Sequence, residues 1–346
     1  MINDFNLAID FYHRMLRIRR IEETIASRYK EQKMRTPVHL SIGQEAVAVA
    51  VGMQLMPFDF AVSTHRGHAH YLAKGGSLKA MLAEIYGKVT GCCRGRGGSM
   101  HLIDRSVGFM GSTAIVGNTI PHGVGLGLAI QLSRDNHVSV VFVGDGAIEE
   151  GVFFESLNFA ILRKLPILFI CENNRYSVYS PFAKRQPADR HIYDVARAMG
   201  AMVDHSDGYD WLKCYQSVNQ ALCDIRQGSG THFLEFETYR WLEHCGPNYD
   251  NDLGYRTEAE FLSWQARDPI AKLKQTLLAS QKITASFLLE KEKAILDEIN
   301  EAFAFAENSS FPEPIEAITG QYKEREASYS DKTSDESDLR LAESFF

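Results

Sequence analysis

An aspartate and an asparagine stand at the ends of two apolar stretches that are typical of buried strands. Asp145 lies between two glycines directly after residues 138–143, and Asn174 follows residues 167–171. A helical pattern separates the two stretches, so both side chains are expected at neighbouring strand ends of a parallel sheet, where open α/β sheets bind ligands. A carboxylate oxygen beside an amide oxygen suits a hard cation such as Mg²⁺ that also holds a diphosphate.

The glycines on either side of this aspartate, Gly144 and Gly146, would let the backbone approach phosphate groups closely. A helix expected to begin near Ala147 would offer its free N–H groups to them. Taken singly, a Gly-Asp-Gly sequence is usually a turn, and an Asn-Asn pair usually caps or turns a chain. Strand, Gly-Asp-Gly, helix, strand and Asn-Asn in this order are much more specific.

The bulk composition is that of a globular α/β domain. The chain has 346 residues, of which 45% are hydrophobic and 23% charged, enough for a large core. Its net charge is −7 and it has no basic tract, which gives little support to binding of nucleic acid or anionic membranes. No apolar run approaches the roughly 18 residues needed to span a bilayer.

The six cysteines include no Cys-x-x-Cys pair, and two of them, Cys92 and Cys93, are adjacent. The first residues are acidic rather than basic, so a signal peptide is not expected. We therefore expect reduced thiols and a cytosolic, cytoplasmic protein.

Apolar residues at helical spacing predict several amphipathic helices, and short apolar runs predict further strands. The helices are expected over 5–33, 43–55, 77–87, 121–132, 210–227 and 286–308, the strands over 201–204 and 232–238, and a mobile loop over 91–99. A nicotinamide site is rejected, because the glycines at 123, 125 and 127 lack the dinucleotide-binding spacing and no strand leads into them.

The composition changes beyond residue 308 to Ser, Asp, Glu and Lys. We expect one domain over 1–308 and an acidic, flexible C-terminal tail over 309–346. The last eight residues, 339–346, are apolar enough to dock on a partner, although an uncommitted end is an equal alternative.

Several segments together make the chain resemble the alpha subunits of thiamine-diphosphate-dependent 2-oxo acid dehydrogenases, which act on pyruvate, branched-chain 2-oxo acids or acetoin. The resemblance runs from about residue 10 to residue 305. The matching segments are His39–Ala46, His65–His68, Gly97–His101, Ile115–Gly117, Gly144–Ala147, Cys171–Tyr176, Thr238–Arg240, Gly254–Thr257 and Asp268–Ile270.

The resemblance implies a three-layer α/β fold, with a mostly parallel sheet and helices on both faces. It implies that Mg²⁺ is held by the side-chain oxygens of Asp145 and Asn174 and by the main-chain carbonyl of Tyr176. It further implies that the backbone of Ala147 and the guanidinium of Arg66 contact the diphosphate of the cofactor.

The resemblance also gives roles to residues around the rest of the cofactor. Val116 would hold the cofactor in a bent shape, with Ala114 beside it, although ordinary core packing is the alternative for Val116. His65 is expected at the cofactor, where many relatives have tyrosine. His39, facing the substrate carboxylate, and His244, close to the thiazolium, are the expected catalytic residues.

Two further residues, His68 and Glu243, have alternative roles. His68 either belongs to the site or only packs and donates hydrogen bonds. Pyruvate-type relatives often have His-Gly-His-Ser where this chain has Leu242-Glu243-His244-Cys245, so a phosphorylation switch at Cys245 is not supported and the substrate is not fixed. Glu243 is either new charge near an anionic substrate or a solvated loop residue.

The resemblance implies a partner as well. The carboxylate that activates the aminopyrimidine belongs to a beta subunit in this family, so an assembly of two alpha and two beta chains is expected. The enzyme would decarboxylate a 2-oxo acid, or cleave acetoin, and pass the acyl group to lipoyl on an acyltransferase. The alternatives are a non-oxidative decarboxylase or ligase on the same scaffold, and a non-catalytic scaffold subunit.

Overall fold

The computed structural model describes residues 4–319. A six-stranded sheet organises the chain, with the strands in the order β2-β1-β3-β4-β8-β7 and every neighbouring pair parallel. Its strands are β1 (Phe60–Ser63), β2 (Phe109–Ser112), β3 (Ser139–Gly144), β4 (Ile167–Asn173), β7 (Met202–Asp207) and β8 (His232–Glu237). A two-residue hairpin, β5 (Tyr176–Ser177) with β6 (Ser180–Pro181), follows β4.

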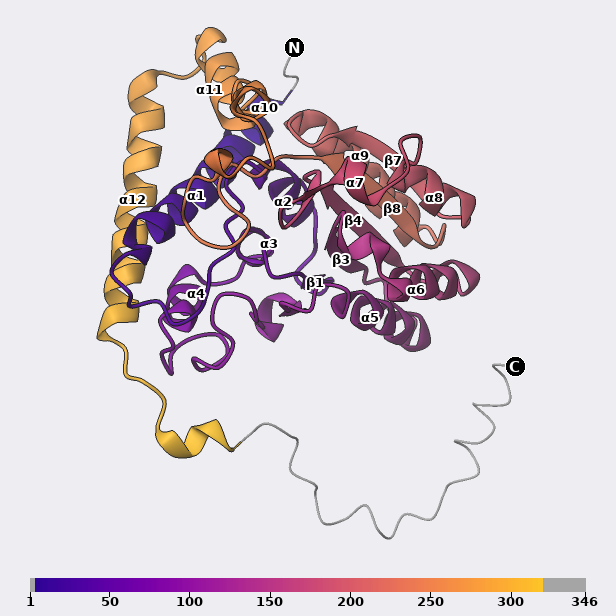
Figure 1. Cartoon of the computed structure of the whole chain (residues 1–346), viewed down its shortest axis with the longest axis horizontal. Helices are drawn as coiled ribbons and strands as arrows, with labels where there is room; N and C mark the ends of the chain where they lie inside the picture. Colours follow the sequence, from indigo (N-terminus) through magenta and orange to yellow (C-terminus); the bar gives the residue numbers. More distant parts are fainter. Residues whose placement is uncertain (1–3, 320–346) are drawn as a thin grey trace. The chain divides into compact units, whose positions relative to one another are not determined.

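Helices surround this sheet (Figure 1). They are α1 (Phe5–Tyr29), α2 (Glu45–Gly52), α3 (His68–Ala73), α4 (Leu78–Ile85), α5 (Thr119–Ser133), α6 (Gly151–Leu162), α7 (Phe182–Arg185), α8 (Ile192–Ala198), α9 (Trp211–Arg226), α10 (Glu258–Gln265), α11 (Pro269–Ala279) and α12 (Ala285–Asn308). Residues 312–319 form a separate short segment with a 3-10 turn at Pro314–Ala317.

The central strands β3 and β4 are buried on both faces, because they are apolar over most of their length. In β3, Val140 and Phe142 join one hydrophobic cluster, which includes α2 and α9, and Val141 and Val143 join the other, which includes α5, α6 and α8. Successive side chains of a strand point to opposite faces, so this division shows two helical layers with the sheet between them. The predicted three-layer fold is confirmed.

The small residues of α5 let this helix pack closely on the sheet. A Cβ atom at Gly123 would lie 2.3 Å from Val141 Cγ2, and one at Gly127 would lie 2.5 Å from Ile167 Cγ1. Gly125, on the other side of the helix, has nothing within 4 Å. The glycines that resembled a nucleotide fingerprint thus serve helix–sheet packing.

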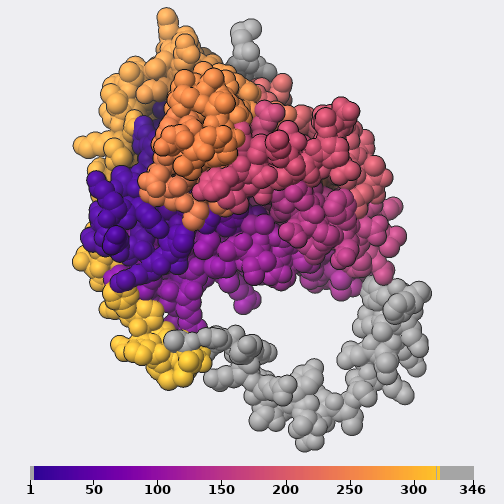
Figure 2. All heavy atoms as spheres, in the orientation of Figure 1, coloured from indigo at the N-terminus to yellow at the C-terminus, as the bar shows by residue number. Residues whose placement is uncertain are grey.

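Segments far apart in the sequence close the domain. Ion pairs join α1 to α12 through Arg17 and Glu298, at 2.6 Å, and through Arg20 and Glu292, at 2.6 Å. In the space-filling view the indigo N-terminal part of the chain lies against the orange part, and α1 contacts α11 and α12 there (Figure 2). No helix in the described part of the chain is long and apolar enough to cross a membrane.

The predicted helices and strands are present with shifted ends, and two short strands were missed, β1 and the edge strand β2. The prediction that a helix begins near Ala147 was wrong. Ala147–Glu149 forms a 3-10 turn, and α6 begins at Gly151. Glu150 has extended backbone, φ −72° and ψ 138°, which interrupts the helix between the two.

The segment 91–99 contains neither helix nor strand, as predicted. Its expected mobility is at odds with its contacts, because the buried carboxylate of Glu84 accepts N–H groups from Cys93, Gly95, Gly97 and Gly98. The flexible tail predicted over 309–346 lies outside the described residues from 320 onward, as does its apolar end at 339–346.

Candidate functional site

A cavity of about 290 Å³ lies at the carboxyl ends of β1, β3 and β4. These parallel strands end at the same edge of the sheet, which is where open α/β sheets place their ligands. Every residue assigned to the site from the sequence lines it, namely His39, His65, Arg66, Ala114, Val116, Gly144, Asp145, Gly146, Ala147, Asn174, Tyr176 and His244.

Asp145 and Asn174 are buried at this edge, with 2% and 9% of their surface exposed. Asp145 directly follows β3, Asn174 directly follows β4, and the two strands pair in register up to Gly144 and Glu172. The sequence order therefore brings both side chains to one cavity, as predicted.

Hydrogen bonds fix the orientation of the Asn174 amide. Its Nδ2 donates to Gln44 Oε1 at 3.1 Å, and its Oδ1 accepts the Tyr176 N–H at 3.2 Å. An amide oxygen has two lone pairs, so Oδ1 keeps one for a further ligand. This arrangement fits the predicted role of Asn174 as an oxygen ligand.

The Asp145 carboxylate forms a buried ion pair with Arg185, which also pairs with Glu149. Burial raises the pKa of Asp145, and the charge of Arg185 opposes that increase. A buried carboxylate at a cavity wall is stabilised by positive charge, so a cation at this position is electrostatically favoured.

The backbone beside Asp145 leaves room for a phosphate group. A Cβ atom at Gly144 would have nothing within 4 Å, whereas one at Gly146 would meet Ser177 Oγ at 2.7 Å. A side chain at Gly146 is therefore excluded by the hairpin that follows the asparagines. Ala147, at the start of the observed 3-10 turn, lines the cavity.

Arg66 brings positive charge to the same cavity. Its side chain is buried and donates hydrogen bonds to the carbonyl groups of Leu40 and His244, the latter at 3.3 Å. Burial and the nearby charge of Arg240 lower the pKa of Arg66 to about 10, so it remains cationic at neutral pH. A guanidinium at this wall suits a diphosphate.

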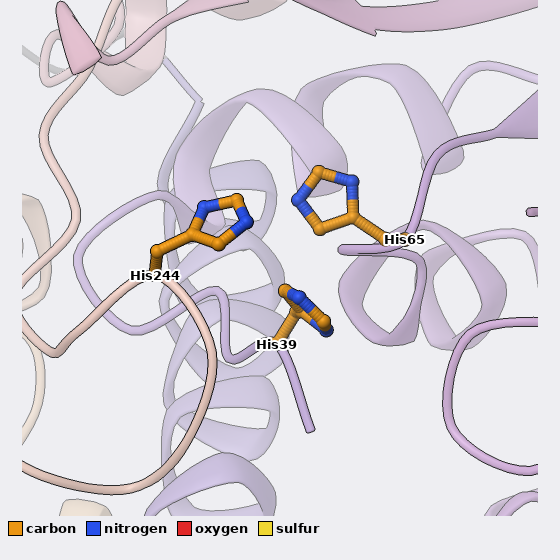
Figure 3. Close-up of side chains that lie close together, drawn as sticks. All are labelled: His39, His65 and His244. Atoms are coloured by element: carbon orange, nitrogen blue, oxygen red, sulfur yellow. The ribbon is translucent and has the colours of Figure 1, made fainter. Parts of the chain in front are cut away.

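Three histidines form a cluster at the cavity (Figure 3). Ring centroids are 4.5 Å apart for His39 and His65, and 5.1 Å apart for His244 with each of the other two. Burial, assisted by the charge of Arg66, lowers the pKa of His39 and of His244 to about 3 and lowers that of His65 as well. All three imidazoles are therefore neutral at pH 7.

Two nitrogens of this cluster are left without partners. The Nδ1 atoms of His39 and His65 are buried and have no hydrogen-bond partner among the described residues. A buried polar atom without a partner costs about 1–3 kcal/mol. Such atoms beside a cavity are expected to bond to whatever occupies it.

His68 does not line the cavity. It is fully buried, with its Nδ1 2.7 Å from Glu22 Oε1 and its Nε2 2.8 Å from Ser99 Oγ. Of the two alternatives for His68, the hydrogen-bonding role is the one observed.

The sequence did not single out Gln44, Glu172 or Arg185 as functional residues. Gln44 and Glu172 line the cavity and lie within two of the matched segments, so the motifs carried a signal for them. Glu172 pairs with His70 at 3.2 Å. Arg185 lies beyond the matched segments, and only folding of the hairpin and α7 brings it to Asp145.

The carboxylate of Glu243, in the altered loop after residue 240, does not face the cavity. The Glu243 carboxylate accepts the N–H of Asn248 at 2.9 Å and its side-chain amide at 2.8 Å. Glu243 does not line the cavity, so it is a loop residue rather than charge beside a substrate. Asp250, buried between Arg240 and Arg256, anchors the loop behind it.

Comparison with known proteins agrees with this site. The model of the dehydrogenase E1 component family matches residues 13–315. The chain is 37% identical to the alpha subunit of acetoin:2,6-dichlorophenolindophenol oxidoreductase of Bacillus subtilis over 317 residues, which covers 91% of this chain and 93% of that protein.

Two pyruvate dehydrogenase E1 alpha subunits are similar to a comparable extent. The chloroplastic alpha-3 subunit of Arabidopsis thaliana is 38% identical over 88% of this chain and 72% of its own length. The alpha subunit of Rickettsia bellii is 36% identical over 89% of this chain and 93% of its own length. The chain thus belongs to the dehydrogenase E1 component family, whose members are thiamine-diphosphate-dependent oxidoreductases, and within it to the alpha-type subunits.

Proposed function

We propose that this chain is the alpha subunit of an enzyme that decarboxylates a 2-oxo acid or cleaves acetoin, and that passes the acyl group to lipoyl on an acyltransferase. The single observation that carries the proposal is the convergence of all twelve predicted site residues on one cavity. The family and the names of its relatives support the reaction class but leave the substrate open between pyruvate and acetoin.

The residues at the cavity fit thiamine diphosphate with Mg²⁺. Asp145 and Asn174 would hold the metal by side-chain oxygens, and Tyr176 by its carbonyl, a hard-oxygen set that Mg²⁺ prefers. Arg66 and the backbone of Ala147 would contact the diphosphate. The buried Asp145 carboxylate at the cavity wall and the space at Gly144 support this fit.

When bound, thiamine diphosphate supplies a carbanion that adds to the substrate carbonyl and then serves as an electron sink. The chain itself would position and support that chemistry. Val116, half-buried at the cavity wall, would hold the cofactor bent. His39 and His244 are neutral at pH 7, so the ring of each can donate one hydrogen bond and accept another beside a bound group.

A beta-type partner is part of the proposal, in an assembly of two alpha and two beta chains. The helices α5 and α6 pack side by side and expose apolar residues at their outer faces, namely Leu132, Phe154, Phe159 and Leu162. Helices that are apolar all round are usually buried, which supports these faces as a docking surface for a partner. The reduced-thiol, cytosolic environment expected from the cysteines stays a prediction.

Binding of the cofactor tests the proposal. Thiamine diphosphate and Mg²⁺ are titrated by calorimetry into the co-purified alpha–beta pair, with Asp145→Ala as the site variant. Asp189→Ala, an exposed aspartate outside the cavity, is the matched control. We expect metal-dependent binding in wild type and control and its loss in Asp145→Ala. Equal binding in all three would contradict the proposed metal site.

Two alternatives have distinct outcomes. A non-oxidative decarboxylase or ligase would transfer its intermediate to an aldehyde acceptor and leave a lipoyl domain unacylated, and the altered loop over 241–252 is the observation that keeps it open. A non-catalytic scaffold would bind no cofactor in the calorimeter. The intact set of Asp145, Asn174, Arg66 and His39 at one cavity favours the enzyme.

A further inference from the structure

Two adjacent cysteines lie in the loop that leads to the cavity. Cys92 and Cys93 are unpaired and partly exposed. Their Sγ atoms and a carboxylate oxygen of Glu84 all lie within 4.8 Å of one another. The proposed reaction uses neither thiol.

The carboxylate of Glu84 binds backbone N–H groups of the loop rather than a metal shared with these sulfurs. Its buried carboxylate accepts N–H groups from Cys93 and Gly95, each at 2.8 Å, from Gly97 at 2.6 Å and from Gly98 at 3.1 Å. Four donors occupy the lone pairs of both oxygens. The carboxylate thus holds the loop in place, and the two sulfurs remain as a dithiol.

The two thiols differ in reactivity. A hydrogen bond from Cys92 lowers the pKa of the Cys93 thiol, against the opposing effects of its burial and of the Glu84 charge. The same hydrogen bond, together with burial, raises the pKa of Cys92. The thiolate is the nucleophile in thiol chemistry, so Cys93 is the attacking residue and Cys92 the resolving one.

We propose that Cys92 and Cys93 are a redox modification site, oxidised by a hydroperoxide to a reversible disulfide between neighbouring residues. The Cys93 thiolate attacks the terminal peroxide oxygen, the O–O bond breaks, and the leaving oxygen takes a proton to form water or an alcohol. The sulfur of Cys92 then attacks the sulfenic acid of Cys93. The S–S bond forms, the S–O bond breaks, and hydroxide leaves as water with the proton of Cys92. Two electrons pass from the thiols to the peroxide.

Backbone geometry makes this disulfide easy to reduce. Neighbouring Cα atoms are about 3.8 Å apart across a trans peptide, whereas Cα atoms joined by a disulfide are usually about 4.4–6.8 Å apart. A bond formed under this strain has a more oxidising potential than a structural disulfide. The oxidised pair therefore returns to the dithiol under cytosolic thiol conditions.

Oxidation of the two cysteines also removes a hydrogen bond in the segment that leads to the cavity. In the reduced pair the Cys93 thiol donates to the carbonyl of His101 at 3.2 Å, and the disulfide has no proton to donate. His101 adjoins Met100, which lines the cavity, and Ser99, which bonds to His68. This coupling rests on the proposed cofactor site. If the disulfide forms, we expect the affinity for thiamine diphosphate to decrease roughly fivefold, about the effect of losing one hydrogen bond.

The oxidation is measured by mass spectrometry on the alpha–beta pair treated with hydrogen peroxide, alkylated with iodoacetamide and digested with trypsin. Cleavage after Lys88 and Arg94 releases residues 89–94, a peptide that holds both cysteines. After peroxide treatment we expect this peptide to carry no alkyl group and to be two hydrogen atoms lighter than the reduced, unalkylated peptide. After reduction with dithiothreitol, alkylation should modify both cysteines again. Cys93→Ser abolishes the product, and Cys92→Ser leaves a sulfenic acid that dimedone traps.

Cys223→Ser, at an exposed cysteine of α9, is the matched control and leaves the product unchanged. The proposal is overturned if residues 89–94 stay doubly alkylated while Cys223 or Cys245 is oxidised, or if Cys93 passes to sulfinic acid without a disulfide. Calorimetry with thiamine diphosphate then tests the coupling. A disulfide that leaves affinity unchanged refutes the coupling alone, and absent binding in both redox states refutes the proposed function alone.

Discussion

The buried histidine cluster predicts an acid sensitivity that can be measured without substrate or cofactor. The pKa of His39 is lowered to about 3 in the folded chain, chiefly by burial, whereas an unfolded histidine titrates near 6.5. Below pH 6.5 the unfolded chain binds a proton that the folded chain refuses, so the free energy of unfolding decreases as the pH falls. This decrease continues until about pH 3.

The size of the effect follows from the two pKa values. Between pH 7 and pH 5 a single histidine with these values removes about 2 kcal/mol from the free energy of unfolding. The substitution His39→Asn removes the titrating group. Between pH 7 and pH 5 the unfolding free energy of this variant is therefore expected to fall by about 2 kcal/mol less than that of the wild-type protein. Buried carboxylates with raised pKa values, such as Glu235, act in the opposite direction but are present in both proteins and cancel.

Urea unfolding at pH 7 and pH 5, followed by circular dichroism, measures this difference. Ser41→Ala is the matched control, because Ser41 is buried in the same segment and does not titrate in this range. We expect Ser41→Ala to run parallel to wild type and His39→Asn to have the shallower pH dependence. Parallel behaviour of all three proteins would refute the conclusion that His39 is held neutral by its burial.

Two further perturbations test the metal site and the packing of α5. Arg185→Met leaves the Asp145 carboxylate without its partner and should lower the stability of the metal-free protein by about 3 kcal/mol, a loss that saturating Mg²⁺ partly restores in thermal unfolding. An equal loss with and without Mg²⁺ would count against a metal at Asp145. Gly123→Ala places a Cβ 2.3 Å from Val141 Cγ2 and should cost about 1–3 kcal/mol in chemical denaturation. In Gly125→Ala the added Cβ meets nothing within 4 Å, so the stability of the isolated chain should stay unchanged, whereas alpha–beta association should weaken in sedimentation. If Gly125→Ala destabilised the chain and Gly123→Ala did not, the assigned faces of α5 would be wrong.

Local patterns were enough to predict the central part of the fold. The apolar runs that became β3 and β4 are buried on both faces, and such continuous runs are typical of parallel sheets. The shorter β1 and β2 were missed because four residues carry little periodicity, and their pairing depends on neighbours distant in sequence. The turn at Ala147 was missed because an extended residue, Glu150, interrupts an otherwise helical pattern.

The sequence by itself was enough to predict which residues meet at the cavity, because strand, turn and helix signals around Asp145 and Asn174 are local and the matched segments are specific. Tertiary structure alone decided their electrostatic state. The pKa values of His39, His65 and His244 are lowered only when the fold buries these side chains together beside Arg66, since burial depends on the whole fold. The pairing of Arg185 with Asp145 and the hold of Glu84 on its loop likewise come from contacts between segments, which no local pattern encodes.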